Sequence, residues 1–307
     1  MNQTMTRGRN QTMTIARHGR PRPAETARAG RPWAGRAWAG RAWARLPDAL
    51  RAEWTKLRTE PGTVWILTAS CVLTVAVGAA TAAATRCGTG TGCAIDPTKV
   101  SLTGIEVGQA VVAVLAVLMI SGEYSTGMIA VTFTAMPRRW TVLAAKAAVL
   151  TGPVLAAAVV AVGGSLAAGR LILTGNGITA AHGFAVVSLA HGPTVRAAAG
   201  SVLYLALVGL LALGIATIVR DSAAATGAVL GILYVPPVIA LFLGSEPAWQ
   251  RWVERYTPTS AGLAVLNTTG LRDLVISPWA GLGVLAAWAA AALLAAGVLL
   301  HLRDVVG

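Results

Sequence analysis

The hydrophobic pattern of this chain is a series of long apolar runs separated by short polar or charged stretches. A run of about 20 apolar residues is long enough to cross the ~30 Å hydrocarbon core of a bilayer as a helix. The pattern predicts membrane-spanning helices at 63–85, 103–121, 145–168, 197–219, 223–243 and 279–300. The sequence therefore predicts an all-α, polytopic integral membrane protein with about six transmembrane helices.

Before the first apolar run, the composition changes completely. Residues 1–46 are rich in Arg, Pro and Gly, and residues of that kind cannot form a hydrophobic core. We predict a disordered, Arg-rich cytoplasmic tail. Its arginines alternate with Trp33, Trp38 and Trp43, a pattern that fits contact with anionic lipid headgroups or plain disorder better than nucleic-acid binding.

A short amphipathic segment follows the tail and precedes the first span. Its apolar residues recur at helical spacing, and they are Leu46, Leu50, Trp54 and Leu57. Charged residues, including Glu53, occupy other positions on the same helical wheel. We predict an interfacial helix at 47–60 that lies on the inner leaflet, and residues 47–307 form the transmembrane domain.

The charge is distributed very unevenly along the chain. Hydrophobic residues make up 55% of it and charged residues 12%, with a net charge of +13, and 13 of the 25 basic residues fall in residues 1–60. Because basic residues accumulate on the cytoplasmic side of membrane proteins, we predict that both termini are cytoplasmic and that the protein lies in the cell membrane. The positive charge thus reflects topology, and no nucleic-acid partner is expected.

The second and third spans are joined by a charged hairpin. Arg138 and Arg139 cannot lie at mid-bilayer, where each Arg costs about 2.5–3.5 kcal/mol. Within the hairpin, Ile129, Phe133 and Met136 recur at helical spacing until Pro137, which gives a short amphipathic segment that can dock on a partner.

The sequence of this hairpin resembles a pattern found in permease subunits of ABC-2-type transporters, especially actinobacterial ones. The resemblance rests on the run GEYSTGMI at 122–129, on Pro137-Arg138-Arg139 and on Lys146, and it covers roughly residues 47–305. In that family, the loop between the second and third helices contacts a separate ATP-binding subunit. The resemblance implies that coupling to the ATPase involves Glu123, Tyr124, Thr126, Gly127, Phe133, Pro137, Arg138 and Arg139.

The resemblance also implies a function. It indicates the transmembrane permease subunit of an ATP-driven exporter, which works as a homodimer or paired with a second permease and contacts membrane lipids. ATP and Mg would be bound by the partner subunit, and this chain would hold no cofactor and catalyse no reaction. The alternatives are a membrane anchor or regulatory protein of the same fold that moves no substrate, and a secondary transporter.

Motifs for chemistry are missing from the sequence itself. None of the three lysines stands in a GxxxxGK[ST] frame, so the chain has no phosphate-binding loop of its own. The histidines show no metal-ligand spacing, and no GxSxG or Ser-His-Asp pattern is present. These absences argue against an enzyme and predict no metal or cofactor site.

Three charged residues lie near the ends of the second and third spans. Glu106 and Glu123 are separated by ~25 Å along a helix, which places one near each interface. Glu106 is read as an interface residue that faces water, or else as a carboxylate of the transport pathway. Lys146 is expected to extend to the inner headgroups and to need no buried partner.

Glycine and proline positions give two further expectations. The small residues Gly152, Ala157, Gly163 and Gly164 predict close helix packing along one span. Pro236-Pro237 should kink or break the fifth span, either for packing or for gating. The segment 244–278 is expected to hold short outer helices, as in the family that the chain resembles.

Two cysteines share one predicted outer loop. Cys87 and Cys93 bracket the flexible stretch GTGTG, which can bring the sulfur atoms together, and an outward-facing loop is oxidising. We therefore predict a disulfide between Cys87 and Cys93.

Overall fold

The computed structural model describes residues 47, 50–51, 53–55, 61–86, 95–125, 139–179, 187–242 and 247–302, all within the unit formed by residues 41–307. In these parts of the chain every regular element is a helix. Six of the helices are long and apolar enough to cross a membrane. The protein therefore has the architecture of a multi-pass membrane protein, as the apolar runs predicted.

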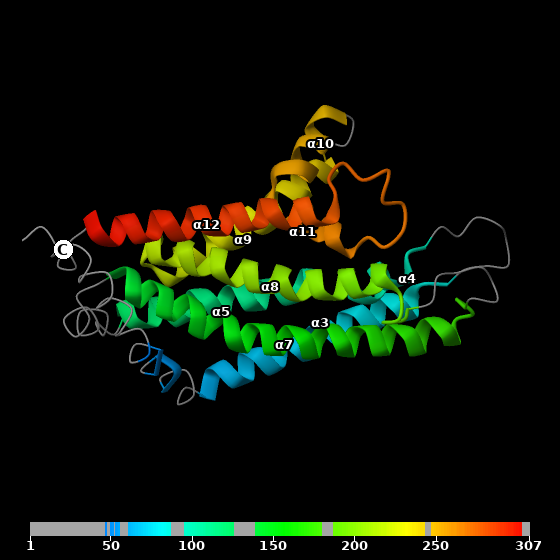
Figure 1. Cartoon of the computed structure of the whole chain (residues 1–307), viewed down its shortest axis with the longest axis horizontal. Coiled ribbons are helices and arrows are strands. Elements are labelled where there is room, and N and C mark those ends of the chain that lie inside the picture. The colour runs from blue at the N-terminus through cyan, green and yellow to red at the C-terminus, as the bar shows by residue number, and fades with distance from the viewer. Residues whose placement is uncertain are drawn as a thin grey trace, which may run out of the picture. The chain divides into compact units, whose positions relative to one another are not determined.

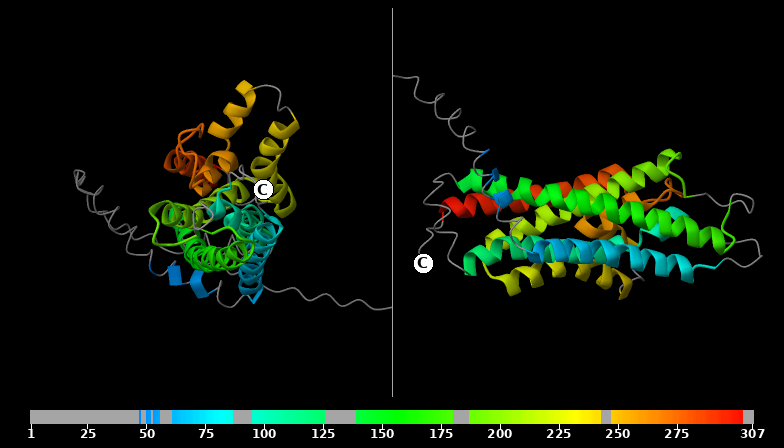
Figure 2. Two further views of the ribbon diagram at one scale, coloured as in Figure 1. Left: turned by 90° about the vertical axis from the view of Figure 1, so that its right-hand side faces the viewer. Right: turned by 90° about the horizontal axis from the view of Figure 1, so that it is seen from below.

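The long helices lie side by side, and shorter ones join them (Figure 1; Figure 2). The long helices are α3 (Pro61–Ala84), α5 (Ile105–Ser125), α7 (Arg139–Gly175), α8 (Gly192–Val219), α9 (Ser222–Phe242) and α12 (Pro278–Leu302). The short ones are α4 (Pro97–Leu102), α10 (Pro247–Tyr256), α11 (Pro258–Leu263) and the 3₁₀-helix η2 (Ala264–Leu266). The expected short helices between the last two spans are thus present, and Figure 1 shows α10 projecting away from the long helices.

Proline marks most helix starts. α3, α4, α10, α11 and α12 begin at a proline, where the missing N–H group would have had no partner within the helix. The prolines inside helices behave differently, because α7 contains Pro153 and α9 contains Pro236 and Pro237 without interruption. Of the predicted kink or break at Pro236-Pro237, the break is therefore wrong and the kink stays a prediction. Membrane helices tolerate such residues.

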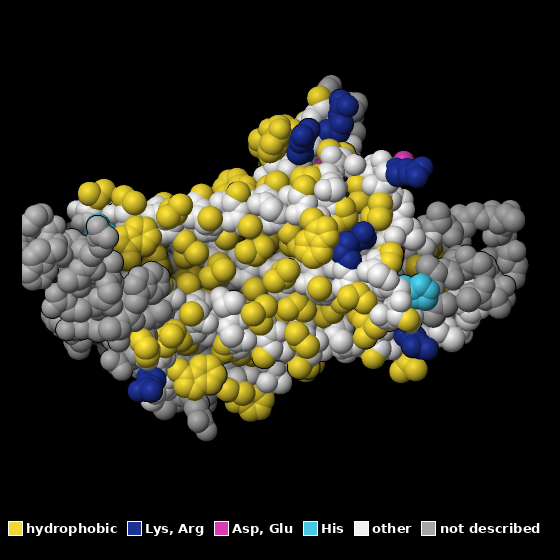
Figure 3. Space-filling model, viewed as in Figure 1, with side chains coloured by type: hydrophobic (Ala, Val, Ile, Leu, Met, Phe, Trp, Pro, Cys, Tyr) yellow, Lys and Arg dark blue, Asp and Glu magenta, His cyan; other side chains and the backbone are white. Residues whose placement is uncertain are grey.

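α8 is the central helix of the described unit. It packs against α5, α7, α9 and α12, and the buried Tyr204, Leu205 and Val208 lie on it. α3 packs on α7 and α5 at the side. Figure 3 shows yellow hydrophobic side chains along the length of the helices on one face, while most of the dark-blue Lys and Arg side chains lie in its right-hand part. This distribution fits a protein surface that faces hydrocarbon.

Close helix approach occurs at other glycines than the sequence indicated. A Cβ atom on Gly104 would lie 1.9 Å from the Thr74 carbonyl oxygen, and one on Gly214 would lie 2.8 Å from Ala292. Of the glycines predicted to pack closely, Gly164 contacts α3, but Gly152 and Gly163 have open space where a Cβ atom would lie. The prediction was therefore wrong for Gly152 and Gly163, because composition does not show which face of α7 meets a neighbour.

Contacts between distant residues define two ends of the bundle. At the first, Lys146 of α7 pairs with Glu123 of α5, and we call this the Lys146 end. At the second, the Asp96 carboxylate accepts hydrogen bonds from the backbone N–H groups of Thr268, at 2.5 Å, and Thr269, at 3.1 Å, and we call this the Asp96 end. These contacts hold the segment after η2 against the start of α4.

Candidate functional site

The most distinctive polar feature is a buried lysine at the Lys146 end. The Lys146 side chain is 1% exposed, and its Nζ atom lies 2.9 Å from Glu53 Oε2 and 2.6 Å from Glu123 Oε1. The three groups come from three places in the chain: the segment 47–55, the last turns of α5 and the first turns of α7. One cation thus joins three separate segments by charge-assisted hydrogen bonds, which are stronger than neutral ones.

This cluster overturns the expectation that Lys146 extends to the headgroups without a partner. The carboxylates are themselves buried, since Glu53 is 5% exposed and Glu123 is 8% exposed. A buried charge is costly unless it is paired, so each member of the cluster depends on the others. Sequence reasoning placed Glu53 on the polar side of an interfacial helix, where a water-facing position is expected, and had no signal that α7 lies there.

The segment 47–55 supports the predicted interfacial helix only in part. Its described residues, 47, 50–51 and 53–55, are helical. Trp54 is 50% exposed, while the neighbouring Glu53 faces α7. The segment is therefore attached to the bundle through its charged residue, whereas the exposed indole ring is available to a headgroup region, where Trp is favoured.

A second contact at this end involves Tyr124 and Arg220. The Arg220 guanidinium lies 5.6 Å from the centre of the Tyr124 ring, within the range of a cation–π interaction. Arg220 ends α8 in a left-handed conformation, with φ 64°, a region uncommon for residues other than glycine. The sequence analysis placed Tyr124 at the coupling loop but did not find Arg220 as its partner.

The start of α7 is attached to the end of α12. Arg139 Nη1 donates a hydrogen bond to the Leu300 carbonyl oxygen. Beside it, the Trp140 ring lies 6.0 Å from the His301 ring and packs against Gly297. A basic side chain that satisfies the last carbonyls of a helix stabilises its C-terminus. The predicted role of Arg139 toward a partner stays a prediction.

Most of the predicted coupling residues cannot be placed. Thr126, Gly127, Phe133, Pro137 and Arg138 lie outside the described residues, as do Cys87 and Cys93. Their coupling role and the disulfide therefore stay predictions. The described members, Glu123, Tyr124 and Arg139, all lie at the Lys146 end, in the ion-pair cluster, the cation–π contact and the bond to α12.

Glu106 lies in the first turn of α5, at the opposite end of that helix from Glu123. Its side chain is exposed, as expected for an interface residue, and its backbone carbonyl accepts a hydrogen bond from the Tyr234 hydroxyl. One turn later, the fully buried Gln109 accepts a hydrogen bond from the Tyr204 hydroxyl. These bonds connect α5 with α8 and α9 near the Asp96 end.

Neither comparison with known proteins identifies a relative. No protein-family model matches the sequence, and no curated protein is similar to it. Among the residues that the structure describes, no group of His, Cys, Asp and Glu side chains is arranged to hold a metal ion. At the Lys146 end, the ion-paired cluster connects three segments that are far apart in the sequence.

Proposed function

We propose that this protein is the transmembrane permease subunit of an ATP-driven ABC-2-type exporter. The observation that carries the proposal is the Lys146 cluster. It joins the segment 47–55 to the end of α5 and the start of α7, the two helices that flank the predicted coupling loop. A displacement of the loop or of the segment 47–55 would be transmitted to both α5 and α7 through the ion pairs of Lys146.

In the proposed mechanism, closure of the ATPase pair pushes on the 122–139 loop. Glu123 and Lys146 transmit the displacement to α5 and α7, while the bond from Arg139 to the Leu300 carbonyl carries it to α12. Tilting of these helices would open the transport pathway toward the other side of the membrane. The chain itself binds no nucleotide in this scheme.

The proposal is tested with a complex purified from the native membrane in mild detergent. The partner must carry a GxxxxGK[ST] motif, identified by mass spectrometry, and the purified complex must hydrolyse ATP. The double variant Arg138→Glu/Arg139→Glu is expected to lose this partner, because like charges at a charged contact can cost several kcal/mol. Arg272→Glu, a reversal of an exposed arginine at the Asp96 end, is the control and should keep it.

A second variant separates coupling from assembly. Glu123→Gln removes one charge from the cluster and leaves Glu53 to pair with Lys146. It is expected to keep the ATPase bound but to reduce the effect of the permease on ATP turnover. A correctly inserted Arg138→Glu/Arg139→Glu variant that binds and stimulates its ATPase normally would remove the loop from the mechanism. Binding of the partner without any effect on ATP turnover would favour the alternative function, a membrane anchor or regulatory protein that moves no substrate.

A further inference from the structure

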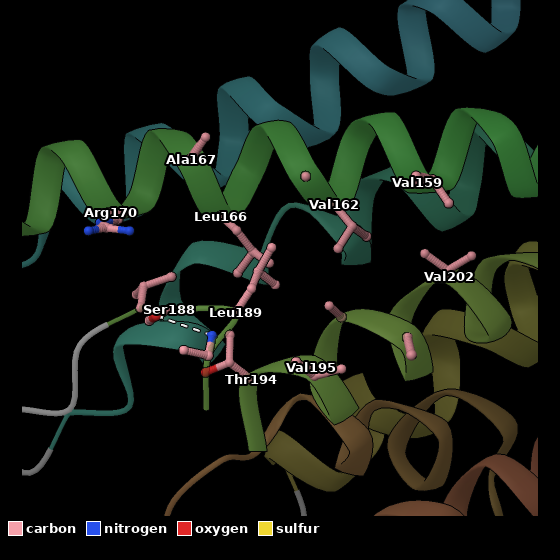
Figure 4. A pocket seen from close by; sticks show the side chains of 15 residues that line it. Val159, Val162, Leu166, Ala167, Arg170, Ser188, Leu189, Thr194, Val195 and Val202 are labelled. Atoms are coloured by element: carbon pink, nitrogen blue, oxygen red, sulfur yellow. Dashed lines mark hydrogen bonds between the residues drawn. The ribbon is translucent and has the colours of Figure 1, made fainter. Parts of the chain in front are cut away.

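An apolar groove lies between α7 and α8, away from the contacts discussed above. Its volume is about 640 Å³, and its lining residues come from three segments: α7, the turn at 187–190 and the first half of α8. Most of them are apolar, such as Val162, Leu166 and Val202, and the polar ones include Arg170 and Ser188. Figure 4 shows Val162 and Leu166 extending from α7 toward the α8 side of this space.

The groove opens on the surface of the protein. Val159 is 59% exposed, Val195 is 44% exposed and Leu189 is 67% exposed, although all three line it. Both helices are candidate membrane spans by their length and composition, and we therefore place this surface within the hydrocarbon. An occupant must therefore be compatible with lipid tails.

The length of the groove matches one leaflet. From Val159 to Arg170, the helical rise of α7 amounts to about 16 Å, roughly half of a ~30 Å hydrocarbon core. A single acyl chain that enters from the Asp96 end would thus reach the bilayer centre where the groove finishes. With the predicted orientation, this is the outer leaflet.

The polar groups of the groove are gathered at one end. Arg170 lies at the end of the α7 lining, and Figure 4 places it on the side of the turn that carries Ser188. Arg170 is exposed, and among the described residues it forms no ion pair. A cation at the mouth of an apolar groove is complementary to an anionic headgroup on an acyl chain, and each basic residue near a membrane surface attracts anionic lipid.

We propose that this groove is a binding site for one anionic phospholipid, whose acyl chain lies between α7 and α8 and whose phosphate contacts Arg170. The proposed site requires only that the two helices lie in the membrane, so it does not depend on the proposed export function. The lipid would fill a surface hollow that the side chains of the described residues leave open.

The test uses the purified full chain in detergent with a mixture of phosphatidylglycerol and phosphatidylcholine, followed by native mass spectrometry. The wild type should retain phosphatidylglycerol in preference to phosphatidylcholine. Gly163→Trp fills the groove, and because nothing lies within 4 Å of a Cβ at this position, the variant is expected to fold. It should lose most of the retained lipid.

The headgroup contact has its own variant. Arg170→Gln should reduce the preference for phosphatidylglycerol about fivefold while lipid of either kind is still retained. Gly152→Trp, at another open glycine of α7 that lies outside the groove, and Arg272→Gln, at an exposed loop arginine, are the matched controls. Both should bind lipid as the wild type does.

Three results would overturn the proposal. If Gly163→Trp retains as much phosphatidylglycerol as Gly152→Trp, the groove does not hold the lipid. If Arg170→Gln keeps the full preference, the headgroup is not recognised there. If Gly163→Trp instead dissociates copies of the chain in the same spectra, the occupant is a second copy and not a lipid.

Discussion

Replacement of Lys146 by Met is the sharpest test of the structure. The change keeps a long apolar stem but removes the Lys146 cation that lies beside the buried Glu53 and Glu123 carboxylates. Both oxygens contact the same nitrogen, at 2.9 and 2.6 Å, so they lie within roughly 5.5 Å of each other. Two unit charges at that separation repel by about 3 kcal/mol at an effective dielectric constant of ~20.

The lost attraction adds to this repulsion, while partial reorientation and protonation of the acids reduce it. Breaking a buried ion pair by removing one partner typically costs about 3–5 kcal/mol, and we expect a loss of that size in the free energy of unfolding. The measurement is an SDS titration of the purified protein followed by Trp fluorescence. Lys99→Met, the same substitution at an exposed lysine, should change the midpoint little.

A triple variant tests whether the loss of stability comes from the two carboxylates. Adding Glu53→Gln and Glu123→Gln to Lys146→Met removes the mutual repulsion of the two carboxylates, and stability should recover by at least half of the loss. The reasoning is refuted if Lys146→Met is no more harmful than Lys99→Met. It is also refuted if neutralising the two acids deepens the loss, since that would mean that the carboxylates are stabilised by something other than Lys146.

Three other predictions concern topology, the outer loop and helix packing. In a Cys-free background, Ser277→Cys should react with an impermeant maleimide on intact cells, and Ser222→Cys only after permeabilisation. The reason is that these two exposed positions lie at opposite ends of the bundle. The reverse labelling pattern would show that the predicted orientation is inverted. Cys87 and Cys93 should be linked in the non-reduced peptide, and mass spectrometry that finds both thiols alkylated would disprove the disulfide. Gly297→Ala should destabilise the protein by about 1–3 kcal/mol, because its Cβ would lie 2.1 Å from the Trp140 ring. Gly283→Ala, in open space on the same helix, should be neutral or stabilising by up to about 1 kcal/mol in the same SDS titration; equal effects would contradict the packing of Trp140 on α12.

The spans could be predicted from the sequence because apolar run length is a local property. The third span shows the limit of this reasoning, since the prediction of 145–168 fell short of the observed Arg139–Gly175 at both ends. Lys146 was expected near the start of this span, and Arg170 lies two residues beyond its predicted end. In the structure, α7 continues past both residues, with Lys146 paired inside the bundle and Arg170 at the mouth of a groove.

The sequence predicted where the candidate site lies but not which residues pair within it. The charged hairpin and its resemblance to the permease pattern indicated Glu123, Tyr124 and Arg139. All three lie at one end of the bundle. Their partners could not be found in the same way, because Glu53 and Arg220 are far away in the sequence and the helical pattern does not encode which faces meet. A buried pairing of this kind depends on tertiary packing.

The positions of the contacts along the chain have a consequence for biogenesis. Synthesis proceeds from the N-terminus, and domains form in that order. Glu53 and Glu123 are both made before Lys146, so the ion-paired cluster can close as soon as α7 enters the membrane. The acceptor of Arg139, the Leu300 carbonyl, is made almost last. The first three spans can therefore assemble as an early unit. The hydrogen bond from Arg139 to the Leu300 carbonyl forms only after the last helix has been made.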